Sequence, residues 1–515
     1  MAVNEFEYDY IVVGGGSAGS VVATLLAENP NYRVLLVDAG KSPDSIPDVW
    51  NPYDNNNLYG MADNWWQGYE TPRYAGSDKT MGVGRSKLFG GCSAVNDMVY
   101  TRGAPADFNR WANFYGCIGW SYSDVESNFK AVEVIIKPST GSKDEFGSAF
   151  IAACNGLGIP YVDNYNSDVP LNGVSPLCST ISSKTIRETS FNSYVQGEVS
   201  NLTLIGGALV SKVLIENSEA TGSFAQPIAK GIEYIASDGS PHTVRCNNEV
   251  ILSAGSINSP KILMSSGVGN RAELEAMGIE VFADSPLVGQ NLQSAVIFQL
   301  SWTTSQPLTL PPPAENGNRR NEGYAITWTN MNRHEQPKTC IEMMPGLYSA
   351  NQPISDLENN YSITGGAMRL LSRGWVKLAS TDPNTPPEIN LNLFADSRDL
   401  DECVESFKIA RDIGNAPELS SLRGMETTPG SDVTTDNEIK QWILNSFNSY
   451  SHPSGTCKMG PDASDAVVDT TLKVHGIQNL RVMDASIMPE ITSGHTQAPS
   501  FMIGHKGASF ILNGE

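Results

Sequence analysis

Two histidines near the C-terminal end are the residues of this chain best suited to move protons. His452 stands in Ser451-His452-Pro453-Ser454-Gly455-Thr456, and His495 stands in Gly494-His495-Thr496-Gln497-Ala498-Pro499. An imidazole titrates near neutral pH and can act as a general acid or base, although most histidines in proteins are structural. Their function therefore depends on what the rest of the chain places beside them.

A dinucleotide-binding pattern opens the chain. Residues 9–13 form a β-branched run that leads into Gly14-Gly15-Gly16-Ser17-Ala18-Gly19, and residues 20–28 have helical periodicity. A second apolar run, residues 33–37, ends at Asp38 and Ala39. The order strand, glycine turn, helix, strand and acid predicts a β-α-β unit that binds a dinucleotide.

Each residue in this pattern is expected to have a specific structural or binding role. Gly14 permits the tight turn, Gly16 lets the backbone approach a pyrophosphate at the helix N-terminus, and Gly19 lets the helix pack on the strand. The carboxylate of Asp38 can accept hydrogen bonds from ribose hydroxyls. The glycines alone do not decide between NAD and FAD. A redox cofactor beside two proton-handling groups predicts oxidation of an alcohol.

Composition narrows the choice of partners. The formal net charge is −22, which makes nucleic acid an unexpected partner because an acidic chain repels phosphates. No apolar run reaches the ~20 residues that span a bilayer, so no membrane is expected. Residues 1–10 carry no Lys or Arg, so no signal peptide is visible, and we expect a cytoplasmic protein or the mature form of a secreted one. The eight cysteines have no C-x-x-C spacing, so no metal site and no disulfide scaffold is expected.

Several further motifs lie between these ends. They are Gly84-Arg85-Ser86-Lys87-Leu88-Phe89-Gly90-Gly91-Cys92-Ser93-Ala94-Val95-Asn96, Ser253-Ala254-Gly255-Ser256-Ile257-Asn258-Ser259-Pro260, residues 286–293, 372–378 and 386–390, and Leu480-Arg481-Val482-Met483-Asp484-Ala485-Ser486. Together with both ends, they resemble the glucose–methanol–choline (GMC) family of flavoprotein oxidoreductases over nearly the whole chain. The resemblance implies FAD rather than NAD.

The resemblance also implies roles for individual residues. The expected FAD-binding residues are Gly14, Gly16, Ser17, Ala18 and Gly19 at the pyrophosphate, Asp38 and Ala39 at the ribose, Gly84, Gly91, Cys92 and Asn96 in the loop against the flavin ring, Val210 at the adenine, and Asp484, Ala485, Thr496 and Gln497 at the pyrophosphate and ring. Some relatives attach FAD through a histidine at the position that Val95 occupies here, so we expect noncovalent FAD.

The active-site pair of the family falls on His452 and His495. His452 is expected to take the hydroxyl proton as general base while flavin N5 accepts the hydride, and His495 to hydrogen-bond the substrate oxygen. Relatives often carry an aromatic residue where this chain has Ser451, and Tyr450 is one candidate to replace it. Residues 494–499 look most like the aryl-alcohol oxidase branch, which favours a primary, often aromatic, alcohol. Electrons would pass to O₂ or to another acceptor.

Three alternatives stay open at this point. A hydroxynitrile lyase would share the fold, retain FAD and use the histidines without net redox chemistry. A flavin-retaining binding protein would have an inactive site, which the intact histidine pair argues against. A NAD-dependent dehydrogenase would use the same N-terminal fingerprint with the other cofactor.

The expected fold class is α/β, with a Rossmann-like FAD-binding domain and an α+β substrate domain built on an antiparallel sheet. Motifs at both ends meet at one cofactor, so the FAD domain is expected to be discontinuous, from residues 1–155, 200–290 and 450–515, with 156–199 and 291–449 in the substrate domain. Periodicity predicts strands at 324–328 and 375–378 and a helix over 399–413. Pro260 is expected to open a short helix, and residues 305–318 to form a mobile surface loop.

Overall fold

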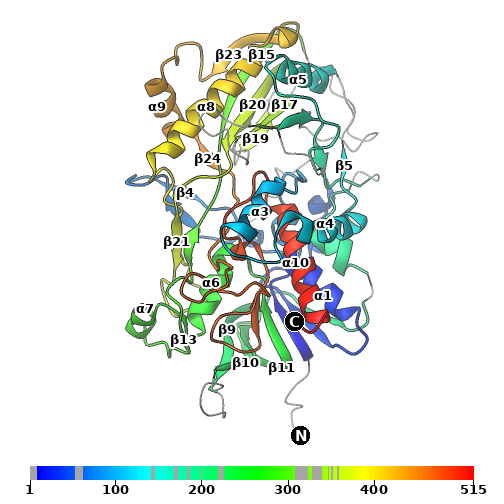
Figure 1. Cartoon of the computed structure of the whole chain (residues 1–515), viewed down its shortest axis with the longest axis vertical. Coiled ribbons are helices and arrows are strands. Elements are labelled where there is room, and N and C mark those ends of the chain that lie inside the picture. The colour runs from blue at the N-terminus through cyan, green and yellow to red at the C-terminus, as the bar shows by residue number, and fades with distance from the viewer. Residues whose placement is uncertain are drawn as a thin grey trace.

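A computed structural model describes residues 8–52, 62–140, 145–166, 172–182, 186–197, 199–217, 226–307, 323–327, 339–345, 347–349, 352–355 and 359–515. The chain forms two large sheets, one above the other in Figure 1, with helices covering each of them.

The lower sheet has a parallel core. Its strand order is β8 (Leu202–Ile205), β2 (Val34–Val37), β1 (Tyr8–Val13) and β11 (Pro241–Leu252), and β25 (Leu480–Val482) pairs with the far edge of β11. Ile11, Val12 and Val13 are buried, because a central parallel strand is covered on both faces. The long β11 continues into an antiparallel ribbon with β10 (Ile228–Ile235) and β9 (Leu209–Glu216).

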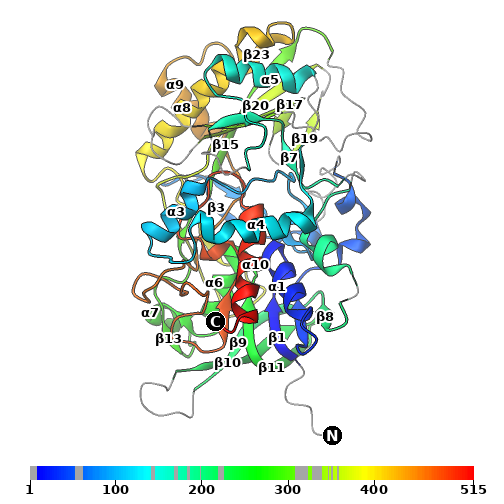
Figure 2. The same ribbon diagram turned by 45° about the vertical axis from the view of Figure 1, so that its right-hand side comes forward.

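Helices from both ends of the chain cover this sheet. Helix α1 (Ser17–Ala27) packs against α10 (Gln497–Leu512), and α10 packs in turn on α4 (Tyr122–Ile136). Figure 2 shows α1, α10 and α4 side by side on the same face of the molecule. Helix α3 (Pro105–Asn113) contacts α4, and α6 (Gly255–Ser265) follows β11 directly. The N-terminal and C-terminal segments are thus joined through one helical layer.

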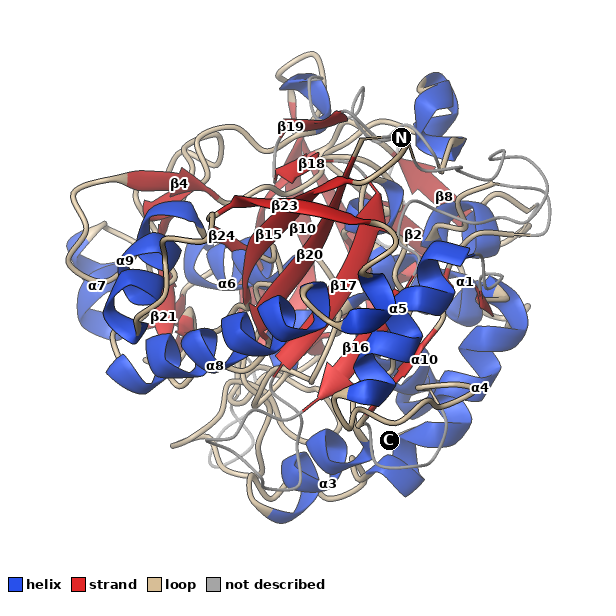
Figure 3. Cartoon of the chain, turned by 90° about the horizontal axis from the view of Figure 1, so that it is seen from above, coloured by secondary structure: helices blue, strands red, loops and turns tan. Residues whose placement is uncertain are grey.

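The upper sheet is antiparallel. Its order is β23 (Arg423–Thr428), β15 (Val296–Thr304), β20 (Asn360–Ala367), β17 (Thr339–Pro345), β16 (Gly323–Thr327) and β6 (Gly173–Ser175), and β24 (Asn448–Ser449) also pairs with β15. Helices α8 (Ser397–Gly414) and α5 (Glu145–Gly156) lie along one face of this sheet (Figure 3), and α9 (Asp436–Ser446) packs on α8. Trp302 and Phe407 are fully buried between the sheet and α8.

Smaller elements complete the described chain. A third sheet consists of β14 (Gln290–Leu292), β21 (Gly374–Lys377) and β22 (Glu388–Asn390). The remaining elements are β3 (Glu70–Pro72) with β4 (Thr80–Gly82), β5 (Ser139–Thr140) with β7 (Cys178–Ser179), β12 (Val268–Gly269) with β13 (Ala283–Asp284), β18 (Leu347–Ser349) with β19 (Gln352–Ser355), helix α7 (Arg271–Ala276), a π-helical turn at Phe191–Val195, and short 3₁₀ turns at Pro43–Ser45, Pro47–Trp50, Ala62–Asn64, Gly91–Ala94, Pro417–Leu419 and Ala485–Ile487.

The expected fold class is confirmed, with a Rossmann-like parallel sheet and an antiparallel sheet in the second part of the molecule. The expected domain boundaries stay a prediction. One helix bears on them, because all of α5 but its last residue, Gly156, lies within the 1–155 range assigned to the FAD domain, and yet α5 packs in the core of the upper sheet. Most of the expected surface loop, residues 308–318, lies outside the described residues. No helix in the described part of the chain is long and apolar enough to cross a membrane.

Candidate active site

A cavity of about 360 Å³ opens between the two sheets. Its floor lies at the carboxyl ends of β1, β2 and β11, where Gly14, Asp38 and Ser253 follow the strands. Open α/β sheets bind their ligands at this edge. Glu342 of β17 and Ile297 of β15 reach the same cavity from the upper sheet. The cavity is therefore shared by the parallel and the antiparallel halves of the molecule.

The glycine turn between β1 and α1 leaves room on its outer side. A Cβ atom on Gly19 would lie 1.9 Å from the Gly14 carbonyl oxygen, and one on Gly14 would lie 2.5 Å from the Ser253 carbonyl oxygen. A Cβ on Gly16 would meet only the Cα atom of Gly91, at 3.8 Å. No side chain caps the first turn of α1. Gly14 and Gly19 are thus required by the protein itself, whereas Gly16 faces open space beside uncapped helix N–H groups.

Asp38 stands at the end of β2 and is tied to this turn. Its carboxylate accepts hydrogen bonds from the Gly15 N–H at 2.8 Å and from the Gly40 N–H at 2.6 Å. Burial raises the pKa of Asp38 to about 6, although the two backbone N–H groups and Lys87 oppose that rise. The carboxylate lines the cavity and is positioned to accept further hydrogen bonds from a ligand.

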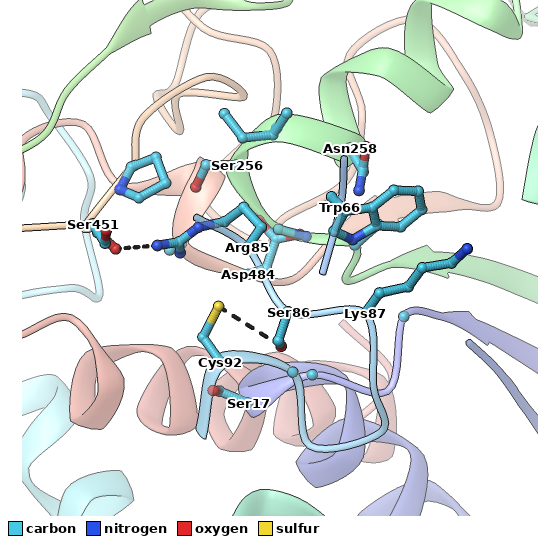
Figure 4. A pocket seen from close by; sticks show the side chains of 18 of the residues that line it. Ser17, Trp66, Arg85, Ser86, Lys87, Cys92, Ser256, Asn258, Ser451 and Asp484 are labelled. Atoms are coloured by element: carbon cyan, nitrogen blue, oxygen red, sulfur yellow. Dashed lines mark hydrogen bonds between the residues drawn. The ribbon is translucent and has the colours of Figure 1, made fainter. Parts of the chain in front are cut away.

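The loop expected against the flavin ring crosses the cavity. Figure 4 shows Cys92 beside Ser17 of α1, and Arg85 extending across the pocket to donate a hydrogen bond to the Ser451 carbonyl. The thiol of Cys92 accepts a weak hydrogen bond from the Ser86 hydroxyl at 4.0 Å. The loop thus joins the glycine turn to the segment that carries His452.

A buried arginine holds the end of this loop. Arg187 donates to the Asn96 backbone carbonyl at 2.5 Å and to the Val49 carbonyl at 3.0 Å. Asn96 Nδ2 donates to Gln497 Oε1 at 2.9 Å, which leaves Gln497 Nε2 buried with no hydrogen-bond partner in the described part of the chain. A buried donor without a partner is costly, so this amide is suited to a ligand in the cavity.

His452 lies against an aromatic wall. Its ring stacks on Tyr450, with centroids 5.0 Å apart and planes at 14°, and the His495 ring lies 5.0 Å away, edge to face. Tyr450 thus supplies an aromatic ring beside His452, where Ser451 has none. Among the described residues, neither ring nitrogen of His452 has a hydrogen-bond partner. Burial lowers the pKa of His452 well below its usual range, and the nearby His495 and Arg85 lower it further.

His495 has a different environment. Its Nε2 atom lies 2.8 Å from Oε1 of Glu342, which is 4% exposed. The proton in this hydrogen bond is carried either by Nε2 of His495 or by the carboxyl group of Glu342. Glu342 stands in the middle of β17, a strand paired on both sides, and therefore fixes the orientation of His495 rigidly. The two histidines therefore differ chemically. His495 is hydrogen-bonded to Glu342, whereas His452 has no hydrogen-bond partner among the described residues.

Two amide side chains from the 286–293 motif hold the segments that carry the histidines. Asn291 Nδ2 donates to the Gly455 carbonyl at 3.1 Å, close to His452. Gln293 Nε2 donates to the Pro489 carbonyl at 3.2 Å, and Gln293 Oε1 accepts from the Ile491 N–H at 3.1 Å. These bonds join the chain before His495 to the chain after His452. The motif therefore supports the relative placement of the two rings.

Asp484 has a more structural position than expected. Its carboxylate accepts hydrogen bonds from the Gly255 N–H at 2.9 Å, the Ser259 hydroxyl at 2.5 Å and the Ser486 N–H at 2.8 Å. Burial raises the pKa of Asp484, against these hydrogen bonds. Asp484 lines the cavity, and its carboxylate fastens the N-terminus of α6 to the segment after β25.

The structure brings together nearly every residue singled out from the sequence. Those that line the cavity are Gly14, Gly16, Ser17, Ala18, Asp38, Ala39, Gly84, Gly91, Cys92, Asn96, Val210, His452, Asp484, Ala485, His495, Thr496 and Gln497. Gly19 lies behind the turn, where it serves packing. The sequence reasoning missed Glu342. The one available signal was its position as a single charged residue within the otherwise largely apolar run 339–344. The sequence reasoning also missed Arg187, which no local pattern distinguishes.

The residues present fit a flavin dinucleotide. The open space at Gly16, the uncapped N-terminus of α1 and the unpartnered amide of Gln497 each call for a bound polar group. Phosphate oxygens satisfy helix N–H groups, and ring carbonyls satisfy amide donors. The cavity is continuous from Asp38 to His452, so it extends from the position expected for the ribose to the two histidines.

Comparison with known proteins identifies the family. Residues 8–297 and 371–504 match the two models described as GMC oxidoreductase. An oxygen-dependent choline dehydrogenase of Pectobacterium carotovorum is 34% identical, over 98% of this chain and 94% of that protein. A protein of the same name from Pseudomonas fluorescens is 33% identical over 98% and 94%.

Solved structures agree with this assignment. Pyridoxine 4-oxidase from Mesorbium loti superposes with a TM-score of 0.86 at 29% identity, over 98% of this chain and 99% of that one. Formate oxidase of Aspergillus oryzae gives 0.88 at 25% identity, over 100% and 99%.

A fungal aryl-alcohol oxidase gives a TM-score of 0.81 at 20% identity over 99% of this chain and 100% of that one, which shows a shared fold. The nearer likeness to the aryl-alcohol oxidase branch therefore stays a prediction, while the resemblance to the family is confirmed. The chain belongs to the GMC oxidoreductase family of FAD-dependent enzymes that act on CH–OH groups.

Proposed function

We propose that this chain oxidises a primary alcohol to an aldehyde, with His452 as the general base and His495 as the group that orients the substrate oxygen. The difference between the two histidines supports this proposal. His452 has no hydrogen-bond partner among the described residues, whereas Glu342 holds His495, and both rings line the cavity that contains the glycine turn. When bound, FAD supplies the hydride acceptor at N5 and passes the electrons to O₂ or to another acceptor.

The electrostatics of His452 suit proton abstraction. Because burial and nearby positive charge keep its pKa low, the ring is neutral at physiological pH and has a free lone pair. His495, held by Glu342, hydrogen-bonds the substrate oxygen and stabilises the alkoxide that forms as His452 takes the proton. General base catalysis of this kind contributes ~10²–10⁴-fold to the rate.

The walls of the cavity favour a small, partly apolar alcohol. Tyr450 stacks on His452, Trp65, Met81 and Ile297 line the same cavity, and an aromatic alcohol suits these surfaces. Three relatives described above are named after small substrates: choline and pyridoxine, which are alcohols, and formate, which is not.

The residues that would hold FAD lie along the cavity floor. The turn at Gly16, with Ser17 and Ala18, would bind the pyrophosphate, Asp38 the ribose, and Gln497 the flavin ring. Val95 offers no atom for a covalent bond, and we therefore propose noncovalent FAD. Acid precipitation of the purified protein should release the flavin into the supernatant. Yellow colour retained in the pellet would contradict noncovalent binding.

The assignment of His452 is tested with His452→Ala. We expect flavin reduction by an alcohol, mixed anaerobically in a stopped-flow instrument, to slow by ~10²–10⁴-fold, while the flavin absorbance shows that FAD stays bound. His242→Ala is the matched control, because His242 is exposed on β11 and lies outside the cavity lining. Near-normal reduction by His452→Ala would refute the assignment.

A panel of aromatic, aliphatic and sugar alcohols separates the alternatives. Bleaching of the flavin would support alcohol oxidation, and rapid return of colour in air would identify O₂ as the acceptor. Persistent bleaching in air would indicate another acceptor. Absence of bleaching with every alcohol, together with cleavage of mandelonitrile, would favour a lyase.

A further inference from the structure

Three side chains with metal-ligating atoms meet where β17 faces the histidine pair. Cys340 and Glu342 are two positions apart on β17, so their side chains project from the same face of the strand. His495 approaches from the segment before α10. The Cys340 thiol, a carboxylate oxygen of Glu342 and a ring nitrogen of His495 all lie within 4.8 Å of one another.

The separations are close to those of a tetrahedral zinc site. Cys340 Sγ lies 3.9 Å from Glu342 Oε1, and Glu342 Oε1 lies 2.8 Å from His495 Nε2. With Zn–N, Zn–O and Zn–S bonds of ~2.0–2.3 Å, tetrahedral ligands stand ~3.3–3.8 Å apart. The oxygen–nitrogen separation must open by about half an ångström and the sulfur–oxygen separation must shorten slightly, which small side-chain rotations allow.

The surroundings favour a bound cation. All three side chains are almost fully enclosed, and Glu342 and His495 line the cavity, which gives an ion a route of entry. A thiolate and a carboxylate would neutralise the charge of a divalent ion at a buried site. A thiol, an imidazole and a carboxylate form a ligand set that selects zinc over the harder Mg²⁺.

We propose that Cys340, Glu342 and His495 bind one Zn²⁺ ion, which inhibits the enzyme in competition with its alcohol substrate. On binding, the Cys340 S–H bond breaks, a Zn–S bond forms, and the proton leaves to solvent. Glu342 and His495 exchange their mutual hydrogen bond for bonds to the metal, the proton of that hydrogen bond leaves to solvent, and Nδ1 of His495 carries the single ring proton. A three-ligand site keeps a fourth position for water, on the side open to the cavity.

Competition with substrate follows from the position of His495. Once its Nε2 binds zinc, His495 no longer hydrogen-bonds Glu342, and the ion with its water occupies space beside His452. The residues of the cofactor turn, Gly16 and Asp38, lie on the cavity floor and are untouched by the ion. Zinc should therefore inhibit without releasing FAD.

The direct test is equilibrium dialysis of the FAD-loaded enzyme against Zn²⁺. We expect one zinc ion per chain, with retention of flavin absorbance, and no binding of Mg²⁺ at the same concentration. Loss of a group that merely supports a metal ligand costs ~10–100-fold in affinity, so Cys340→Ser should weaken zinc binding by at least ~100-fold. Cys92→Ser is the matched control, because Cys92 is a second thiol in the same cavity and should leave zinc binding unchanged.

Glu342→Gln provides a second variant if Cys340→Ser fails to retain FAD, and it should also lose zinc. Steady-state kinetics on the wild type should show an increase in the apparent KM with zinc and recovery with EDTA. Absence of zinc binding to the wild type, full binding by Cys340→Ser, or its loss in Cys92→Ser would overturn the proposal. Dialysis measures binding without turnover, so its outcome is independent of whether an alcohol is the substrate.

Discussion

At the residue scale, Asp38 couples the cofactor site to pH. Its pKa of about 6 exceeds the ordinary value of 3.8, because burial disfavours the charged form. The native protein therefore binds more protons at this carboxyl than the unfolded chain does between about pH 4 and 6. By linkage, the contribution of Asp38 to the stability of the cofactor-free protein decreases as pH rises through that window.

FAD binding should show the opposite trend with pH. Ribose hydroxyls donate hydrogen bonds, so they favour ionised Asp38, and below its pKa each pH unit costs up to ~10-fold in affinity. We expect the dissociation constant of FAD to rise by roughly 10-fold from pH 7 to pH 5. Fluorescence titration of the cofactor-free protein checks this. In Asp38→Asn, the same titration should be flat over this range, and an unchanged slope would exclude Asp38 as the source.

The two histidines and Glu342 show where sequence reasoning succeeds at this scale. His452 and His495 could be identified because each stands in a short local motif that also resembles the family. Glu342 is brought to His495 by the pairing of β17 with β16 and β20, which no local pattern encodes. The proposed mechanism depends on the difference between the two histidines. That difference could therefore be recognised only from the three-dimensional structure.

At the scale of elements, glycine has two different roles in the turn between β1 and α1: Gly19 is needed for packing, and Gly16 leaves space for a ligand. Gly19→Ala should prevent folding of the β-α-β unit, because its Cβ would lie 1.9 Å from the Gly14 carbonyl oxygen. In contrast, Gly16→Ala should fold normally, because its Cβ meets only Gly91 Cα at 3.8 Å. The added methyl group would project into the space proposed for the pyrophosphate, so this variant should be purified without flavin.

Circular dichroism and flavin absorbance together check this pair of variants. The expected result is a folded, colourless Gly16→Ala protein and an insoluble or unfolded Gly19→Ala protein. Retention of full FAD content by folded Gly16→Ala would show that the cofactor does not approach the backbone at this turn.

Prediction of elements was accurate where periodicity was strong. The helix expected over 399–413 is α8, Ser397–Gly414, and the strands expected at 324–328 and 375–378 are β16 and β21. The prediction that Pro260 opens a short helix was wrong. Helix α6 begins at Gly255 and contains Pro260 in its interior. Asp484 accounts for the earlier start, since its carboxylate accepts from Gly255 N–H and Ser259, a contact from the far end of the chain.

At the scale of the whole molecule, one buried acid links segments that are distant in sequence. Glu490 pairs with Arg110 of α3 at 2.7 Å and with Arg369, which follows β20 of the upper sheet, at 2.8 Å. The side chains of Arg369 and Glu490 are 8% and 10% exposed. This three-residue network therefore fastens the upper sheet to the layer that carries His495.

Glu490→Gln should destabilise the protein strongly. Removal of one partner from a buried ion pair leaves uncompensated charge and costs ~3–5 kcal/mol. Thermal unfolding, followed by circular dichroism, checks this. Asp465→Asn is the control, because Asp465 pairs with Lys458 at the surface with 79% of its side chain exposed, and we expect a change within ~0.5 kcal/mol there. Equal effects of the two variants would contradict the role given to the buried network.

The meeting of distant motifs at one cavity could be anticipated from the sequence, because both ends resemble parts of one cofactor site. The arrangement of the two sheets could not, since it depends on side-chain pairs such as Arg369 with Glu490 that the chain order does not reveal.

The position of β25 has a consequence for biosynthesis. This strand, Leu480–Val482, completes the edge of β11, and α10 closes the helical layer over α1. A nascent chain that has passed the glycine turn still lacks the far wall of its cofactor pocket until residues up to Leu512 have been translated. Cofactor capture must therefore come late in synthesis, and a chain truncated before Leu480 would leave β11 as an open sheet edge, prone to aggregation.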